Sequence, residues 1–206
     1  MEKKYKLTEE TINVIDKTLY RIEALRDFSD VKKGDKGGYV KKEENLSQSD
    51  DCWVYNDAMV YDNAMVFGNA KVCDNAMVYD NAMVYGNAKV CDNAIVYGNT
   101  IVSDNVRVYG NAVIFGYAAI CGDTVITSNS DYIVFKNWWS SGRYFTWTKS
   151  NNMWKVGCFH GTGKELIEKA YKDSEISGRE YERVVKYVES IIADDGKEVQ
   201  INRRDY

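Results

Sequence analysis

The chain has 206 residues, of which 45% are hydrophobic and 28% charged, a composition ordinary for a soluble globular protein. No apolar run approaches the roughly 18 residues that a membrane-spanning helix needs. The net charge of −4 is concentrated in residues 49–130, which carry three basic and nine acidic residues. This balance argues against a long nucleic-acid groove there, because phosphates are held mostly by Lys and Arg.

The start of the chain and its cysteines favour a cytoplasmic protein. The first residues, MEKKYKLTEE, are charged and lack the apolar core of a signal peptide. The five cysteines contain no CxxC pair, and without a secretory signal such an odd set predicts free thiols, not a disulfide framework or a zinc site. They are Cys52, Cys73, Cys91, Cys121 and Cys158.

Residues 1–48 differ in sequence pattern from the centre of the chain and are expected to form an N-terminal cap. Residues 12–25, INVIDKTLYRIEAL, suggest either a strand, a turn and a strand, or a short helix. The Gly-rich stretch KKGDKGGYV is then expected to turn the chain towards the central region. A cap is needed there because an uncovered strand edge invites aggregation.

A six-residue repeat runs through the centre of the chain. In the register YDNAMV, hexads continue without a break from Tyr55 to Ile126, and the preceding hexad, SDDCWV, also fits. Residues 58–75 recur as residues 76–93 with one difference, Phe67 against Tyr85. A short fixed period over so much chain indicates a β-solenoid, in which each coil hydrogen-bonds to the next.

Each position of the hexad has an expected place. The sixth residue is Val or Ile and the fourth is small, so both should face inward. The second and third are Asp, Gly or Asn, which tolerate the left-handed backbone of a tight corner. Aligned Asp corners, such as Asp62 with Asp80 and Asp74 with Asp92, are expected either to bind a cation or to accept hydrogen bonds from corner amides.

These hexads resemble those of the hexapeptide-repeat family of left-handed β-helices. The resemblance implies three hexads per triangular coil, so that the 18-residue copy is one duplicated coil, and it implies a homotrimer. The expected fold class is therefore mainly β: a left-handed parallel β-helix of about 4–5 coils over residues 49–130. Residues 1–48 form its N-terminal cap, and residues 131–206 form a C-terminal α+β cap.

Stacking at an interval of 18 residues places the outward-facing fifth positions in three ladders. One ladder carries Lys71, Lys89 and Arg107, which either hold an anion or form a solvated face. The other two are apolar, and exposed apolar stripes usually mark an interface. They form either the trimer contact or a surface that flanking segments cover. The interface residues expected are Met59, Met65, Met77, Met83, Ile95, Ile101 and Val113.

The family resemblance raises the question of enzymatic activity. Many hexapeptide-repeat proteins transfer an acyl group from coenzyme A or acyl carrier protein, commonly with a His as general base. This chain has a single His, His160, and it lies beyond the repeats. The sequence also lacks GxSxG, HExxH and metal-spaced Cys/His motifs. We therefore expect no catalytic residue, no metal and no cofactor, with an atypical acyltransferase using His160 as the alternative.

After Ile126 the periodicity stops, and an aromatic-rich segment predicts a small β-meander followed by helices near residues 163–173 and 178–193. The GTGK stretch at the first helix offers backbone amides to a phosphate, and the tryptophans offer faces to a base. The alternative is that the tryptophans are core and the glycines only a turn. The candidate ligand-binding residues are Trp138, Arg143, Trp147, Lys149, Trp154, Lys155, His160, Thr162 and Lys164.

The segments RDFSDVKKGDKGGYV and KKEENLSQ before the repeat, and TKSNNMWKVGCFHGTGKELIEKAY after it, resemble small solenoid proteins commonly encoded by phages and prophages. This resemblance implies a non-enzymatic oligomeric protein of the host cytoplasm. We expect it to counter host defence by sequestering a small anionic, nucleotide-like ligand. The alternatives are an inhibitor or scaffold that binds a host defence protein, and the atypical acyltransferase. Neither a membrane nor a long nucleic acid is an expected partner.

Overall fold

The computed structural model describes residues 3–139 and 141–195. Two compact units are present, Met1–Cys158 and Phe159–Tyr206. Within the described residues, no helix is long and apolar enough to cross a membrane.

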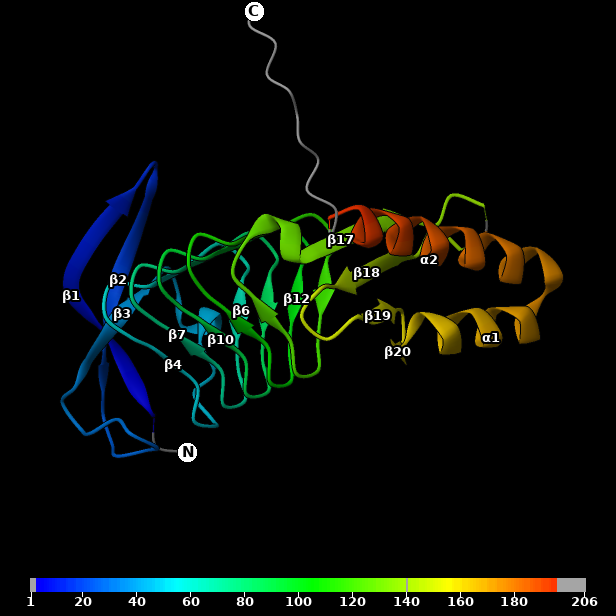
Figure 1. Cartoon of the computed structure of the whole chain (residues 1–206). Helices are drawn as coiled ribbons and strands as arrows, with labels where there is room; N and C mark the ends of the chain where they lie inside the picture. Colours follow the sequence, from blue (N-terminus) through cyan, green and yellow to red (C-terminus); the bar gives the residue numbers. More distant parts are fainter. Residues whose placement is uncertain (1–2, 140, 196–206) are drawn as a thin grey trace, which may run out of the picture. The chain divides into compact units, whose positions relative to one another are not determined.

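The first unit is built on a parallel β-solenoid of about five coils (Figure 1). Each hexad forms one two-residue strand and one corner, and strands 18 residues apart pair in parallel, as Met59 with Met77 and Lys71 with Lys89. The strands are β4 (Trp53–Val54), β5 (Met59–Val60), β6 (Met65–Val66), β7 (Lys71–Val72), β8 (Met77–Val78), β9 (Met83–Val84), β10 (Lys89–Val90), β11 (Ile95–Val96), β12 (Ile101–Val102), β13 (Arg107–Val108), β14 (Val113–Ile114), β15 (Ala119–Ile120) and β16 (Val125–Ile126). The expected mainly-β solenoid is thus confirmed.

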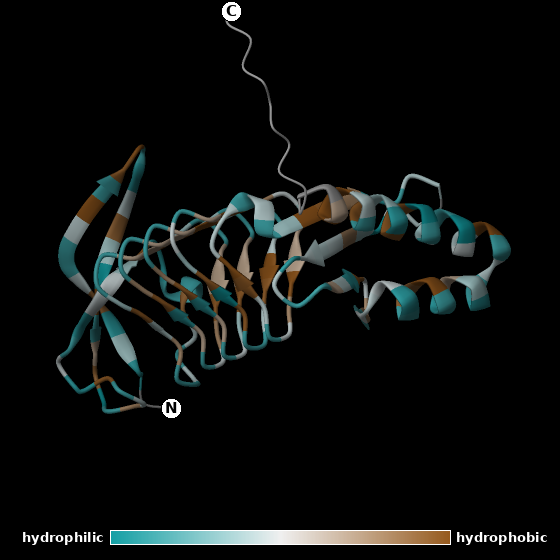
Figure 2. Ribbon diagram, viewed as in Figure 1, coloured by the Kyte–Doolittle hydropathy of each residue, from teal (hydrophilic) through white to brown (hydrophobic). Residues whose placement is uncertain are grey.

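The strands form the faces of the coil. One face runs β5-β8-β11-β14, the second β6-β9-β12-β15 and the third β4-β7-β10-β13-β16. The sixth-position Val and Ile side chains and the fourth-position Ala side chains are almost fully buried between these faces, for example Val78 and Ala76 at 0% exposure. Apolar strand positions therefore alternate with hydrophilic corners along the ribbon (Figure 2).

The corners have the left-handed backbone that the repeat predicts, with φ of 59° at Asp80 and 70° at Gly86. Asp carboxylates at these corners accept hydrogen bonds from the backbone N–H one coil further on, as Asp80 does from Gly98 at 3.2 Å. The Asn residues next along the chain form side-chain amide ladders, with Asn69 donating to Asn87 at 3.0 Å. Of the two roles expected for the Asp corners, these contacts confirm the acceptance of amide hydrogen bonds at Asp74, Asp80 and Asp92. The Asp62 carboxylate instead accepts from the ammonium groups of Lys17 and Lys41.

The N-terminal segment covers the first coil with an antiparallel hairpin. Strand β1 (Tyr5–Val14) pairs with β2 (Lys17–Ala24), which confirms the strand, turn and strand expected over residues 12–25. Strand β3 (Lys36–Val40) pairs antiparallel with β2 and parallel with β5, and a short 3-10 helix, Glu43–Asn45, comes after it. Parallel pairing therefore begins before residue 49, because β3 supplies a face of the first coil.

The other end of the solenoid is closed by side chains. The backbone N–H groups of Val113, Ala119 and Val125, one on each face, donate to side-chain oxygens of Asn129, Thr146 and Ser150 at 2.8–3.0 Å. These acceptors belong to the segment that contains a second 3-10 helix, Asn129–Asp131, and an antiparallel meander. The meander strands are β17 (Tyr132–Lys136), β18 (Tyr144–Thr148) and β19 (Met153–Val156). The meander thus belongs to the same compact unit as the solenoid.

The second unit contains a helical hairpin. Strand β20 (Phe159–Gly161) precedes helix α1 (Gly163–Asp173), which packs against helix α2 (Glu175–Asp195). The buried side chains include Leu166 on α1 and Val185 on α2. Helices near residues 163–173 and 178–193 were predicted from the spacing of apolar side chains, and both are confirmed.

Candidate functional site

An interruption in a ladder of aromatic side chains creates the candidate site. Each strand of the second face is followed directly by the first residue of the next hexad. On successive coils these residues are Phe67, Tyr85, Ser103 and Cys121. The rings of Phe67 and Tyr85 are stacked, with centroids 4.7 Å apart and planes 7° from parallel. On the next coil the position holds Ser103, so the stack does not continue over the other face of Tyr85.

A hollow of about 420 Å³ lies where the ring is missing, and we call it the Tyr85 notch. This volume falls in the range of small-molecule sites. The notch is lined by Tyr85, Ile101, Ser103, Asp104, Tyr117, Ala119, Ile120, Cys121, Tyr144, Lys155 and Gly157. Most of the lining residues therefore belong to the solenoid. The meander contributes Tyr144 from β18, Lys155 from β19 and Gly157, which follows β19.

A second stack separates the notch from a neighbouring hollow. Tyr117, on a corner of the last coil, stacks on Tyr144 of β18 with centroids 4.3 Å apart and planes 8° from parallel. Both rings also line a hollow of about 580 Å³ with Phe115, Gly116, Asn129, Tyr132, Ile133 and Val134. The paired rings are therefore a shared wall, and half of the surface of Tyr117 is exposed.

The polar groups of the notch include a cation, a thiol and a carboxylate. Lys155 contributes a cation to the wall. Burial raises the pKa of the Cys121 thiol, an effect that the charge of Lys155 opposes, so this thiol stays protonated near neutral pH and is a poor nucleophile. The Asp104 carboxylate accepts a hydrogen bond from the Gly122 N–H at 2.9 Å, which gives it a structural role.

Lys155 and Arg143 are the predicted ligand residues that lie at or beside the notch. Arg143 approaches Gly157, one of the lining residues: its Cδ is 3.7 Å from the position that a Cβ on Gly157 would take. Lys155 stands on β19, and Arg143 immediately precedes β18. Lys155 therefore lies in the lining of the notch, and Arg143 lies next to the lining residue Gly157.

The predicted tryptophans do not share one environment. Trp147 and Trp154 face each other across β18 and β19 and are 3% and 2% exposed, so they are core and offer no free face to a base. The indole N–H of Trp147 donates to Asn152 at 2.8 Å. Trp138 is 82% exposed and packs edge-on against Trp139. Trp147 and Trp154 thus agree with the alternative interpretation of the meander as an aromatic core.

The remaining predicted ligand residues lie elsewhere. Lys149 is exposed, directly after β18. In the second unit, His160 is exposed on β20 and Lys164 is 3.9 Å from Glu168. Thr162 caps α1, and the Glu165 carboxylate accepts hydrogen bonds from its N–H and hydroxyl, both at 2.8 Å. The chain's own carboxylate therefore already occupies the helix start where a phosphate was expected.

The outward apolar ladders are partly covered. Met59 packs against a cluster that contains Leu19 and Tyr39 from the N-terminal strands, as the alternative of flanking segments predicted. On the second face Met65 remains 42% exposed, and Ile101 lines the notch. The other expected interface residues, Met77, Met83, Ile95 and Val113, are half-buried. A trimer contact stays a prediction.

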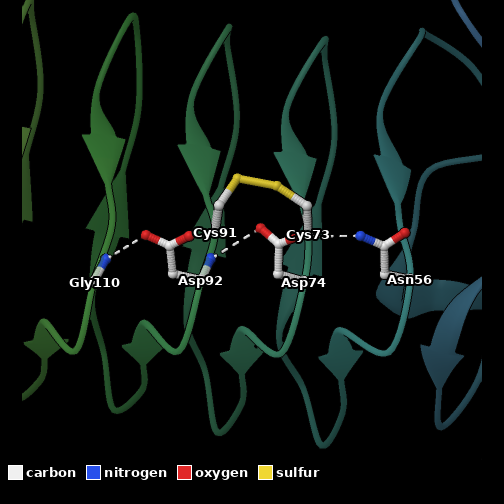
Figure 3. Close-up of a disulfide and its surroundings, with 6 residues drawn as sticks. All are labelled: Asn56, Cys73, Asp74, Cys91, Asp92 and Gly110. Carbon is white, nitrogen blue, oxygen red and sulfur yellow. Dashed lines mark hydrogen bonds between the residues drawn. A yellow bond between two sulfur atoms is a disulfide. The ribbon is translucent and has the colours of Figure 1, made fainter.

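The prediction of free thiols is wrong for two cysteines. Cys73 and Cys91 form a disulfide, with Cα atoms 4.6 Å apart (Figure 3). The cause is the repeat itself, because residues 18 apart stack on adjacent coils at a distance that suits a disulfide. Cys52, Cys121 and Cys158 are free, and only Cys158 is exposed.

Most of the notch was missed from sequence, although one signal was available. The hexad SDNVRV places Ser103 where the two preceding members of the same ladder carry an aromatic ring. That substitution marks a gap in the stack. The contribution of Tyr144 and Lys155 to the same hollow had no such signal, because it depends on how the meander packs on the last coil.

Comparison with known proteins agrees with this architecture. The YdcK beta solenoid repeat model matches residues 70–86 and 88–104, within the repeat region that forms one side of the notch. The chain is similar to that repeat. No curated protein matches the chain. The matched description names a structural repeat and no catalytic activity, so it supports the solenoid, and a repeat architecture by itself does not fix a function.

Proposed function

We propose that this protein is a non-enzymatic binding protein that holds a small, planar, anionic ligand of nucleotide type in the Tyr85 notch. The observation that carries the proposal is the interrupted stack: Tyr85 is stacked on one face by Phe67, and its other face borders a hollow at the level of Ser103. A planar heterocycle there would continue the ladder at aromatic stacking distance.

Two cations at the notch are the reason that we propose an anionic ligand. Lys155 lines the notch and Arg143 lies beside Gly157 at its edge. Lys and Arg are the usual partners of phosphate groups, and a partly enclosed site strengthens such contacts relative to bulk water. Sequestering a nucleotide signal in this way is how a phage-type solenoid protein would counter host defence, and that role stays a prediction.

The test fills the notch with the residue that the ladder lacks. In Ser103→Tyr, the new ring would extend the Phe67–Tyr85 stack and displace the ligand without removing a cation. We expect thermal shifts with cyclic oligonucleotides, ADP-ribose derivatives or NAD in the parent protein, and none with this variant. A ligand at about one hundred times its dissociation constant adds roughly 2.7 kcal/mol of stability, which is readily measured.

Two charge variants complete the design. Lys155→Gln removes the cation from the notch, whereas Lys89→Gln removes an exposed lysine from the third face. Weaker binding by Lys155→Gln alone supports the proposal. Equal binding by Ser103→Tyr and the parent protein, or an equal effect of both lysine substitutions, contradicts it.

An inhibitor or scaffold role is a second candidate, and the exposed Met65 on the second face favours it. That face would contact a host protein or a second copy of the chain through its apolar ladder. Met65→Glu should then abolish the partner contact or the trimer in sedimentation while leaving ligand shifts unchanged. An acyltransferase remains the third candidate, and unchanged acyl transfer in His160→Ala would exclude His160 as its base.

A further inference from the structure

The Cys73–Cys91 pair lies beside a carboxylate on an outer corner of the solenoid. The sulfur atoms of both cysteines and a carboxylate oxygen of Asp74 lie within 4.8 Å of one another. Cys91 is 7% exposed and Cys73 is half-buried, so the cluster stands at the surface of the coil. Figure 3 shows the two sulfurs bridging adjacent coils with Asp74 next to them. This cluster is separate from the ladder that forms the Tyr85 notch.

We propose that the reduced form of this cluster binds a thiophilic divalent cation such as Zn²⁺ or Cd²⁺, with Cys73, Cys91 and Asp74 as ligands. Thiolates and a carboxylate are a donor set that such cations accept, and three protein ligands leave a fourth position for water. The disulfide is the form that cannot bind, because its sulfurs are bonded to each other and carry no thiolate.

The solenoid spaces the two thiolates suitably. In a tetrahedral site with Zn–S bonds of about 2.3 Å, two sulfurs stand roughly 3.8 Å apart. The Cα atoms of Cys73 and Cys91 are held 4.6 Å apart by parallel pairing of the coils. Rotation about the side-chain bonds is therefore enough to move from a disulfide to a metal-bound pair, and the backbone ladder stays in register.

Asp74 has capacity for a metal beside its structural bonds. One carboxylate oxygen accepts from the Asn56 amide and the other from the Asp92 N–H, each at 3.1 Å. An ionised carboxylate offers about four lone-pair sites, so these two hydrogen bonds leave room for one metal bond. These hydrogen bonds also fix the direction of the carboxylate. The backbone of Asp74 has the left-handed φ of a solenoid corner, 60°.

The chemistry requires a reductant, which we name as a trialkylphosphine. The S–S bond of the disulfide breaks, both sulfurs gain a proton, and phosphorus is oxidised to the phosphine oxide with oxygen taken from water. Binding of the divalent cation then displaces the two thiol protons. Metal affinity should therefore rise with pH, and two protons should be released per metal.

The experiment uses the full chain in a Cys158→Ser background, which removes the exposed free thiol. The phosphine-reduced protein is titrated with Cd²⁺, and thiolate-to-metal absorption and heat are recorded. We expect one Cd²⁺ per chain, and no such binding by the disulfide form or by the Cys73→Ser/Cys91→Ser variant. Circular dichroism checks that each sample keeps its β structure.

Asp74→Asn and Asp92→Asn form a matched pair, because both residues occupy the same corner position on adjacent coils, and Asp92 accepts from the Gly110 N–H instead of joining the cluster. Losing a direct ligand should weaken binding by more than the roughly 10–100-fold typical of losing an outer partner. Asp92→Asn should leave binding unchanged. Equal affinities for these two variants, or Cd²⁺ binding that survives loss of both cysteines, would overturn the proposed site.

Discussion

The ammonium group of Lys4 lies 2.9 Å from the carbonyl oxygen of Cys52 and 3.3 Å from its sulfur. Lys4 is fully buried and also donates to the carbonyl oxygens of Ser49 and Asp50. Burial lowers the pKa of this lysine, and its neighbours partly oppose the effect. A single side chain therefore supplies hydrogen bonds to backbone carbonyls just before the first strand of the third face.

Lys4→Met should lower the free energy of unfolding by about 1–3 kcal/mol, because it leaves the buried carbonyl oxygen of Cys52 without this donor. Urea unfolding measures the change. Lys3→Met is the control, since Lys3 makes an exposed ion pair with Glu43 worth less than about 1 kcal/mol. Equal effects of the two substitutions would contradict the role given to Lys4, and would mean that an apolar chain of similar volume serves as well.

Gly86→Ala should destabilise the protein more than Gly116→Ala. Both glycines have positive φ, 70° and 75°, so both variants incur the cost of a left-handed alanine, about 1–2 kcal/mol. A Cβ on Gly86 would also lie 2.8 Å from the Asp104 backbone nitrogen, whereas nothing lies within 4 Å of one on Gly116. We expect a further loss of about 1 kcal/mol at Gly86, measured by thermal unfolding. Equal losses would show that adjacent coils separate readily.

Thr146→Val should destabilise the closed end of the solenoid. The Thr146 hydroxyl accepts the hydrogen bond of the Ala119 N–H at 3.0 Å, and Thr146 is 1% exposed. Valine keeps the shape and leaves the donor unpaired, at a cost of about 1–3 kcal/mol. Thr146→Ser keeps the hydroxyl and should cost less than about 1 kcal/mol. The reverse order in denaturant unfolding would mean that packing of the methyl group matters more than the hydrogen bond.

The stability of the first coils should fall at alkaline pH through Tyr55. Burial raises the pKa of Tyr55 to about 12, with a contribution from Asp30, whose carboxylate accepts from its hydroxyl at 2.8 Å. The folded state holds this proton more tightly than the unfolded state, so the stabilisation is complete below the unfolded pKa of about 10. It is lost as pH rises towards 12.

Tyr55→Phe keeps the ring and removes the titrating proton. The stability of the parent protein relative to this variant should therefore shrink between about pH 10 and 12, as measured by urea unfolding at a series of pH values. Tyr61, whose pKa burial also raises to about 12, titrates in both proteins and cancels in the difference. A difference that grows with pH would contradict the assignment.

The sequence alone determined the solenoid. Most hexads carry the same local pattern. A branched aliphatic residue and a small residue point inward, and an Asp or Gly followed by Asn forms the corner. Every coil needs only its neighbours, so a short period specifies the solenoid. The family resemblance implied the 18-residue register, and the structure decided between the two roles left open for the Asp corners. The two C-terminal helices were equally readable, because their apolar spacing is local.

Tertiary packing decided the rest. Trp147 and Trp154 were candidate stacking residues and became core, because strand pairing sets them opposite each other. Lys155 meets Ser103 and Tyr85 at one hollow because the meander folds onto the last coil, a contact between distant segments that no repeat encodes. Cys73 and Cys91 were misassigned for a different reason. The register already stacked them, and a disulfide depends on distance between side chains, not on spacing within a motif.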